Sequence, residues 1–119
     1  MKSDNLLATE SFRFALRVVK LSMYLQKDHK EYILSRQILR SGTAIGAIVR
    51  ESEFAQSKAD FVNKLSQALK EANETDYWLA LLHESGFINE KMYQSIEPEI
   101  KTLIKLLVSS VKTVKSKME

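Results

Sequence analysis

The chain has 119 residues, 45% of them hydrophobic, which is enough for one domain that buries about two thirds of its surface. It has no cysteine, which excludes disulfides, thiolate catalysis and sulfur-ligated zinc and is compatible with a reducing cytoplasm. The net charge of +3 is too mild to identify a nucleic-acid-binding protein, and no segment reaches the roughly 20 apolar residues that span a bilayer. We therefore expect a single cytoplasmic domain over residues 1–119, with no membrane partner.

Apolar residues in the first quarter of the chain recur at the spacing of an α-helix. They form one broad apolar face, which consists of Phe12, Leu16, Val19 and Met23, flanked by Ala15, Val18 and Leu25. Apolar residues four and three apart fall on the same side of a helix. The pattern predicts a first helix over about residues 6–27.

The same alternation continues after a polar turn and predicts a second helix over about residues 32–54. Its stripe consists of Leu34, Ile38, Ser41, Ile45, Ile48, Ser52 and Ala55. Gly42 and Gly46 lie inside it, where two glycines together cost about 2 kcal/mol relative to alanine. The favoured interpretation is helix packing, because glycines four apart open a groove for another helix. The alternative is a bare backbone face that meets a partner or a nucleic acid.

Local signals mark the ends of a third helix over residues 58–85. Ser57, followed three residues later by Asp60, is typical of a helix N-terminus. Gly86 suits the left-handed conformation that stops a helix. The apolar stripe between these signals consists of Phe61, Leu65, Ala68, Ala72, Thr75, Leu79 and Leu82.

A fourth helix is predicted over residues 90–116, with Asn89 as its cap. Pro98 lies inside it and should kink the helix or split off a turn at residues 90–96. Four long helices joined by short turns pack most simply side by side. The predicted fold is all-α, an up-down-up-down antiparallel four-helix bundle.

Residues suited to enzyme chemistry are sparse. Only His29 and His83 could serve as near-neutral general bases or imidazole ligands, and both lie near predicted helix ends. Carboxylate-bridged metal sites in helix bundles require a glutamate three residues before the histidine, and neither histidine has one. The motifs of phosphate-binding loops, serine nucleophiles and zinc proteases do not occur. We expect no enzymatic activity, no metal and no cofactor.

Basic side chains remain as candidates for a function. Arginines occur in pairs four residues apart, which repel each other unless an anion or an acidic group lies between them. The last part of the fourth helix carries lysines and no acidic residue from Ile100 to Met118. The candidate nucleic-acid-binding residues are Arg13, Arg17, Arg36, Arg40, Arg50, Lys101, Lys105 and Lys112. The alternative is charge complementarity within the bundle or between subunits, since residues 58–85 carry five acidic and three basic groups.

Several runs in the middle of the chain resemble a known family. The runs are Arg40-Ser41-Gly42-Thr43-Ala44-Ile45-Gly46-Ala47, Arg50-Glu51, Ala55-Gln56-Ser57-Lys58-Ala59-Asp60-Phe61, Leu65-Ser66-Gln67-Ala68-Leu69-Lys70-Glu71-Ala72 and Glu74-Thr75-Asp76-Tyr77-Trp78-Leu79. Over about residues 36–88 they resemble the four-helix-bundle proteins encoded in intervening sequences of bacterial 23S ribosomal RNA genes, the S23 ribosomal protein-like family. The accessory protein of diversity-generating retroelements is a more distant relative, a pentameric ring that binds nucleic acid and a reverse transcriptase.

This resemblance implies a bacterial, non-enzymatic homo-oligomer, a pentameric ring by analogy, that associates with RNA or DNA and with a partner protein. Relatives usually carry asparagine where this chain has Ile48, so a polar contact made by that asparagine would be missing here. The alternative function is a purely structural or protein–protein interaction oligomer without a nucleic-acid role. Apolar residues off the main stripes favour assembly in either case, namely Ile33, Val49, Val62, Leu69, Trp78 and Leu81.

Overall fold

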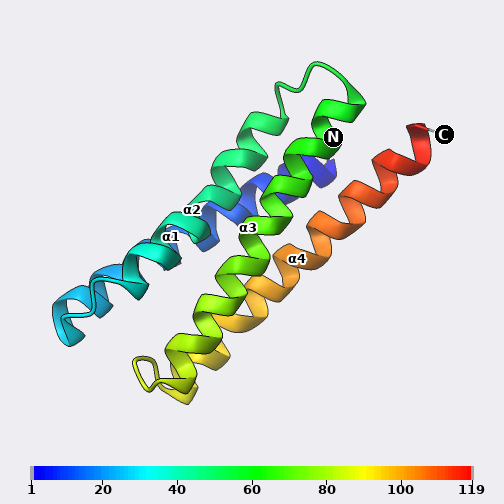
Figure 1. Cartoon of the computed structure of the whole chain (residues 1–119). Helices are drawn as coiled ribbons and strands as arrows, with labels where there is room; N and C mark the ends of the chain where they lie inside the picture. Colours follow the sequence, from blue (N-terminus) through cyan, green and yellow to red (C-terminus); the bar gives the residue numbers. More distant parts are fainter. Residues whose placement is uncertain (1, 119) are drawn as a thin grey trace.

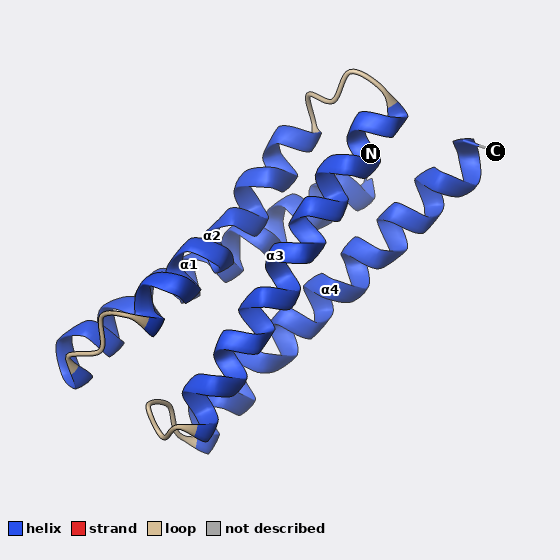
Figure 2. Cartoon of the chain, in the orientation of Figure 1, coloured by secondary structure: helices blue, strands red, loops and turns tan. Residues whose placement is uncertain are grey.

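The described residues of the chain form four helices. The computed structural model describes residues 2–118, and the side chains of residues 6–118. The helices are α1 (Lys2–His29), α2 (Leu34–Ser52), α3 (Lys58–Glu84) and α4 (Glu90–Met118), with short loops between them (Figures 1 and 2). Each helix runs antiparallel to the next, and the start of α1 and the end of α4 lie at the same end of the bundle (Figure 1). The fold is the predicted all-α up-down-up-down four-helix bundle.

Short capping contacts set the helix ends near the loops. The Ser57 hydroxyl accepts a hydrogen bond from the Asp60 amide at 3.0 Å, and the Asn89 side chain accepts one from the Met92 amide at 2.8 Å. Gly86 has a φ of 85°, which is the left-handed conformation expected after α3. These three signals were readable in the sequence because each acts within three or four residues.

The turn between α1 and α2 is built differently from the prediction. α1 ends at His29 and Lys30 takes a left-handed conformation, with a φ of 53°. α2 then begins at Leu34, and its first turn is held by the Glu31 carboxylate, which accepts a hydrogen bond from the Ser35 amide at 2.8 Å. A glutamate in this role was not recognised in the sequence.

α4 runs unbroken through Pro98, so of the two predicted alternatives, a kink or a turn split off at residues 90–96, the split is wrong. Proline removes the hydrogen bond that would reach the Gln94 carbonyl one turn earlier. Both Pro98 and Gln94 are exposed, so water can bond that carbonyl and the helix continues.

The predicted stripes of α2, α3 and α4 face a common core. The fully buried residues of α3 and α4 are Leu65, Ala68, Ala72, Thr75, Leu79, Leu82, Ile100, Leu103 and Leu107. On α2, Ile38, Ser41 and Ile45 are buried as the spacing indicates. Val49 was expected to lie off the core and to serve assembly, which is wrong, because only 2% of it is exposed.

The single broad apolar face predicted for α1 is also wrong. The buried residues of this helix are Leu7, Phe14, Val18, Leu21 and Leu25, whereas Phe12, Leu16, Val19 and Met23 are exposed. At 100° per residue the centres of these two sets lie roughly 150° apart. Both sets have helical spacing, so periodicity alone could not choose between them. Ser11 and Ser22 lie on the side of this buried set that faces α2, and both are themselves buried and let α2 come close.

The glycines of α2 lie where this helix approaches α1. A Cβ atom added to Gly42 would lie 2.8 Å from both γ-methyl groups of Val18. A Cβ atom added to Gly46 would lie 3.3 Å from the carbonyl oxygen of Ser11. Both distances are below ordinary van der Waals contact and favour the packing role of the two glycines.

Candidate nucleic-acid interface

Three of the eight predicted basic residues form ion pairs between helices of the bundle. Arg17 of α1 contacts Glu99 of α4 and donates hydrogen bonds to the backbone oxygen and the hydroxyl of Ser95, at 3.0 and 2.9 Å. These contacts cross the seam between α1 and α4. An arginine held in this way has fewer donors left for a phosphate.

Arg40 and Lys101 behave similarly on the neighbouring seams. Arg40 of α2 lies 3.6 Å from the carboxylate of Glu71 and 3.3 Å from that of Glu74 on α3. Lys101 of α4 donates to Asp76 of α3 at 2.6 Å, and this hydrogen bond raises the pKa of Lys101 above its ordinary value of 10.5. For these residues the structure favours charge complementarity within one chain.

The remaining arginines lie apart from one another. Arg13 pairs with Glu10 on the same helix at 3.3 Å and is largely exposed. Arg50 places its guanidinium 5.8 Å from the centre of the Phe12 ring, in a groove between α1 and α2. Arg36 is exposed and has no ion pair among the described residues. The eight predicted residues therefore do not form one site.

Lys105 and Lys112, the last two predicted residues, border a hollow of about 430 Å³ on α4. It is lined by Ile104, Lys105, Val108, Ser109, Lys112 and Thr113. Both lysines are exposed, and neither pairs with an acidic side chain of residues 6–118. A phosphate could therefore reach both ammonium groups without displacing a carboxylate.

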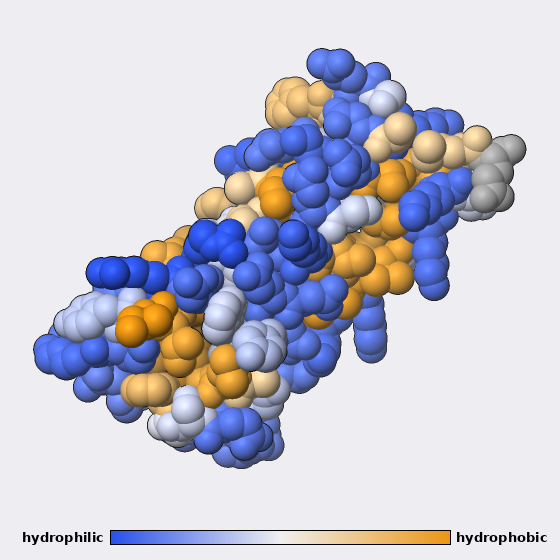
Figure 3. Space-filling view, viewed as in Figure 1, coloured by the Kyte–Doolittle hydropathy of each residue, from blue (hydrophilic) through white to orange (hydrophobic). Residues whose placement is uncertain are grey.

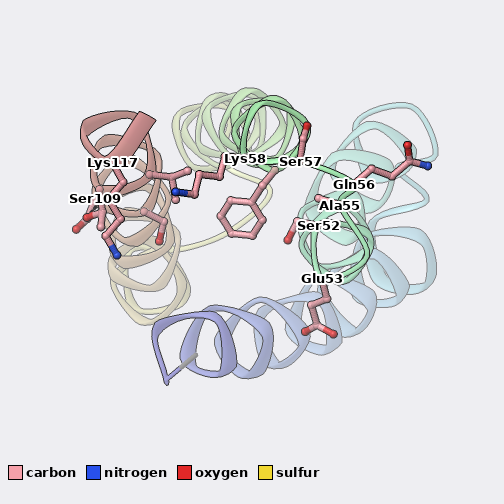
Figure 4. Close-up of a pocket in the computed structure, with 12 residues that line it drawn as sticks. Ser52, Glu53, Ala55, Gln56, Ser57, Lys58, Ser109 and Lys117 are labelled. Atoms are coloured by element: carbon pink, nitrogen blue, oxygen red, sulfur yellow. Dashed lines mark hydrogen bonds between the residues drawn. The ribbon is translucent and has the colours of Figure 1, made fainter. Parts of the chain in front are cut away.

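A larger hollow of about 570 Å³ lies next to it, between the C-terminal part of α4 and the turn that joins α2 to α3. Lys58 extends from the start of α3 toward α4, which carries Ser109 and Lys117 (Figure 4). The lining also includes Phe61, and among its described residues Glu53 is the only one with a carboxylate. Lys58 was not predicted as a site residue, because only the antiparallel packing of α3 and α4 brings it beside the end of the chain.

The two hollows form one surface, since Ser109 and Thr113 line both. We call Lys58, Lys105, Lys112 and Lys117 together the lysine end. The face formed by α3 and α4 shows hydrophobic side chains between hydrophilic ones near this end (Figure 3). Ammonium groups around an apolar, hydroxyl-bearing hollow suit a ligand with phosphates and a flat ring.

The two histidines lie away from this surface. His83 contacts the Glu90 carboxylate at 2.6 Å and stacks on the Tyr93 ring, with 4.1 Å between ring centres. His29 lies 3.0 Å from the Tyr24 hydroxyl. Among the described residues no three acidic or histidine side chains gather as a metal site would require, and no helix is long and apolar enough to cross a membrane.

Comparison with known proteins identifies the family. A model of the 23S rRNA-intervening sequence protein family matches residues 3–109. The chain belongs to this family. The chain is also similar to a protein of known crystal structure. That protein, of unknown function and from the S23 ribosomal protein family of Bacteroides thetaiotaomicron VPI-5482, is 51% identical in sequence, and the two structures match with a TM-score of 0.91. The alignment covers 92% of this chain and 98% of that one. No curated protein matches.

The family match bears on the lysine end in two ways. It includes Lys58 and Lys105, so these two positions belong to the part shared with other 23S rRNA-intervening sequence proteins. It ends at residue 109, before Lys112 and Lys117. The family model therefore covers only half of the lysines that surround the two hollows.

Proposed function

We propose that this 23S rRNA-intervening sequence protein is a non-enzymatic, homo-oligomeric module that binds RNA or DNA through the lysine end. The observation that carries the proposal is that its four lysines border two adjoining hollows and pair with no acidic side chain of residues 6–118. The family name, which refers to sequences within ribosomal RNA, is consistent with RNA as the ligand.

The chemistry of the surface favours contacts with the nucleic-acid backbone. Ammonium groups bind phosphates as point charges and do not read the sequence. The larger hollow adds Phe61 and Val114, which offer an apolar surface to an unpaired base, and hydroxyls that can bond its edge. Structured RNA with exposed loops is therefore the preferred ligand.

Assembly would compensate for the small charge of each chain. A subunit of net charge +3 binds weakly alone, but a ring repeats the lysine end and adds avidity. The resemblance to the retroelement accessory protein makes five the expected number of copies. Light scattering should then report five times the chain mass of 13.7 kDa. A mass of 13.7 kDa at micromolar concentration would remove the oligomeric part of the proposal.

The binding test replaces the four lysines of the lysine end with glutamine. Fluorescence anisotropy with a structured RNA should show at least tenfold weaker binding at low salt. The slope of the logarithm of the binding constant against the logarithm of salt concentration should flatten by roughly 0.7 to 0.9 for each phosphate that the variant no longer neutralises.

Lys101→Gln is the matched control, because Lys101 lies on the same helix but is held by Asp76. This variant should bind RNA almost like the wild type. The proposal fails if the four-lysine variant retains normal binding, or if Lys101→Gln alone weakens binding as much.

A purely structural oligomer is the second candidate. It is favoured by the ion pairs of Arg17, Arg40 and Lys101, which use three predicted binding residues inside the bundle. In this case none of the variants above changes RNA binding, because the wild type itself binds RNA no better than an uncharged protein of its size.

A further inference from the structure

A hollow of about 510 Å³ lies between α1 and α4 and has no part in the proposed function. We call it the seam hollow. Its apolar lining consists of Leu21, Tyr24, Ile88, Met92 and Ile96. Leu21, Ile88 and Ile96 are buried and belong to the core of the bundle, so the hollow opens directly onto that core. Its volume lies within the roughly 300 to 1,000 Å³ that is typical of sites for small ligands.

One end of the seam hollow is bridged by a side chain. Arg17 of α1 donates hydrogen bonds to the backbone oxygen and the hydroxyl of Ser95 on α4, and pairs with Glu99 one turn further on. From Arg17 to Tyr24 the lining extends over about two turns of α1, which is roughly 10 Å. A helix of another protein laid along the seam would collide with this bridge, whereas a molecule about 10 Å long fits beside it.

The charged side chains that line the seam hollow are all basic. Lys20 of α1 and Lys91 of α4 are exposed, and neither pairs with an acidic side chain of residues 6–118. The third basic residue, Arg17, has its charge matched by Glu99. Two ammonium groups beside one hollow repel each other, and an anion between them removes this repulsion. The lysines therefore favour a ligand with a negative charge.

The hydroxyl groups of the seam hollow already have partners. The Ser95 hydroxyl accepts a hydrogen bond from Arg17 at 2.9 Å, and the Tyr24 hydroxyl lies 3.0 Å from the Nε2 atom of His29. The larger hollow of the lysine end is different, because serine and threonine hydroxyls line much of it. The seam hollow thus suits a ligand whose charged group is its main polar part.

We propose that the seam hollow binds a small carboxylate that carries an apolar chain or ring. The apolar part lies on the buried side chains of the hollow, and the carboxylate lies between Lys20 and Lys91. This inference is independent of RNA binding, since the seam hollow shares no lining residue with the lysine end. The ligand would also stabilise the protein, because it links α1 to α4 where the contact between helices is least extensive.

The first experiment titrates the full chain with octanoate by isothermal calorimetry. One octanoate should bind per chain, and the melting temperature should rise with its concentration. Two control ligands separate the parts of the molecule, because acetate has the charge without the chain and octanol has the chain without the charge. Each should bind at least about tenfold more weakly than octanoate, since it makes only one of the two kinds of contact.

The second experiment repeats the octanoate titration with Lys20→Gln/Lys91→Gln. Binding should weaken about fivefold, which is the expected effect of removing two exposed ion pairs. The matched control is Lys27→Gln/Lys115→Gln, which removes the same charge from exposed positions of the same two helices outside the hollow. This control should bind octanoate like the wild type.

Several results would overturn the proposal. They are a wild type that does not bind octanoate, acetate or octanol that binds as tightly as octanoate, and unchanged binding by Lys20→Gln/Lys91→Gln. A loss of octanoate binding in the variant that replaces the four lysines of the lysine end would place the ligand there and would also overturn it. None of these results changes the RNA-binding test, which measures a different surface.

Discussion

The two seams that hold α1 in the bundle are built in opposite ways. Against α2, α1 packs over a long contact in which Gly42 lies beneath Val18 and Gly46 lies beneath the backbone of Ser11. Against α4 the contact is less extensive, and a hollow of about 510 Å³ lies between the two helices. There the linking contacts come from Arg17, which reaches Ser95 and Glu99.

This difference shows which residues set the distance between helices. Small residues on both sides of the first seam have no large side chain that would hold the two backbones apart. The helices therefore pack closely, and dispersion and apolar burial stabilise the seam. Long charged side chains bridge the second seam and leave space beneath them. We therefore expect steric substitutions in the first seam to cost far more stability than charge removal in the second.

The largest effect is expected from Gly42→Ala. The new methyl group would overlap the γ-methyl groups of Val18, which is fully buried and cannot turn away. Overpacking of this kind outweighs the gain in helix propensity, and we expect a net loss of about 2 kcal/mol in the free energy of unfolding, measured by urea denaturation.

The second-site control for this prediction is Val18→Ala. Combined with Gly42→Ala it removes the overlapping methyl groups, so the double variant should lose at least about 1 kcal/mol less than the sum of the single losses. Gly46→Leu should also destabilise the protein, by about 1 to 2 kcal/mol, although the adjacent groove can take part of the side chain. A Gly42→Ala protein more stable than the wild type would show that this seam is not tightly packed.

A smaller effect is expected from Arg17→Gln in the second seam. Its ion pair with Glu99 is partly exposed on both sides, and such pairs contribute about 1 kcal/mol or less. The urea midpoint should therefore fall only slightly, and added salt should reduce the difference from the wild type. A loss as large as that of Gly42→Ala would contradict the distinction between the two seams.

Much of the fold could be predicted from the sequence because its signals are local. The cap at Ser57 and the stop at Gly86 act within one helical turn, and the main stripes of α2, α3 and α4 are the sides that face the core. α1 is different, since Val18 and Val19 belong to two apolar sides and only the position of α2 decides which is buried. Gly42 and Gly46 indicated that another helix packs closely against α2, but the sequence did not indicate which helix.

The candidate site was less predictable because it depends on contacts between distant segments. Arg40 does not belong to the site because it pairs with Glu71 and Glu74, which lie more than thirty residues later in the sequence. Lys58 enters the site because α3 begins beside the end of α4. The spacing of charges along one helix indicated Lys105 and Lys112, which border the same hollow. It gave no information about which acidic side chains on a neighbouring helix would pair with a basic residue.

The smallest expected effect is a loss of stability at alkaline pH. It arises at the seam between α3 and α4, where close packing is combined with charged side chains. The pKa of Lys101 is raised above 10.5, first by its hydrogen bond to Asp76 and then by the charge of that carboxylate. The pKa of Tyr93 is raised above 10.0, first by burial and then by the charges of Glu97 and Asp76.

Both shifts predict a loss of stability on the alkaline side. The favourable interaction of Lys101 is fully present below the unfolded-state pKa of 10.5 and is lost as the pH rises through the higher folded-state value. The unfolded tyrosine ionises at a lower pH than folded Tyr93, so unfolding is also favoured as the pH passes 10.0. Thermal unfolding between about pH 9 and pH 11 should therefore show a falling melting temperature, and Lys101→Gln/Tyr93→Phe should show a shallower fall. Because Lys101 is exposed to solvent, its contribution to stability should stay below about 1 kcal/mol. If the melting temperature of the double variant falls with pH as steeply as that of the wild type, the alkaline loss belongs to other lysines and tyrosines.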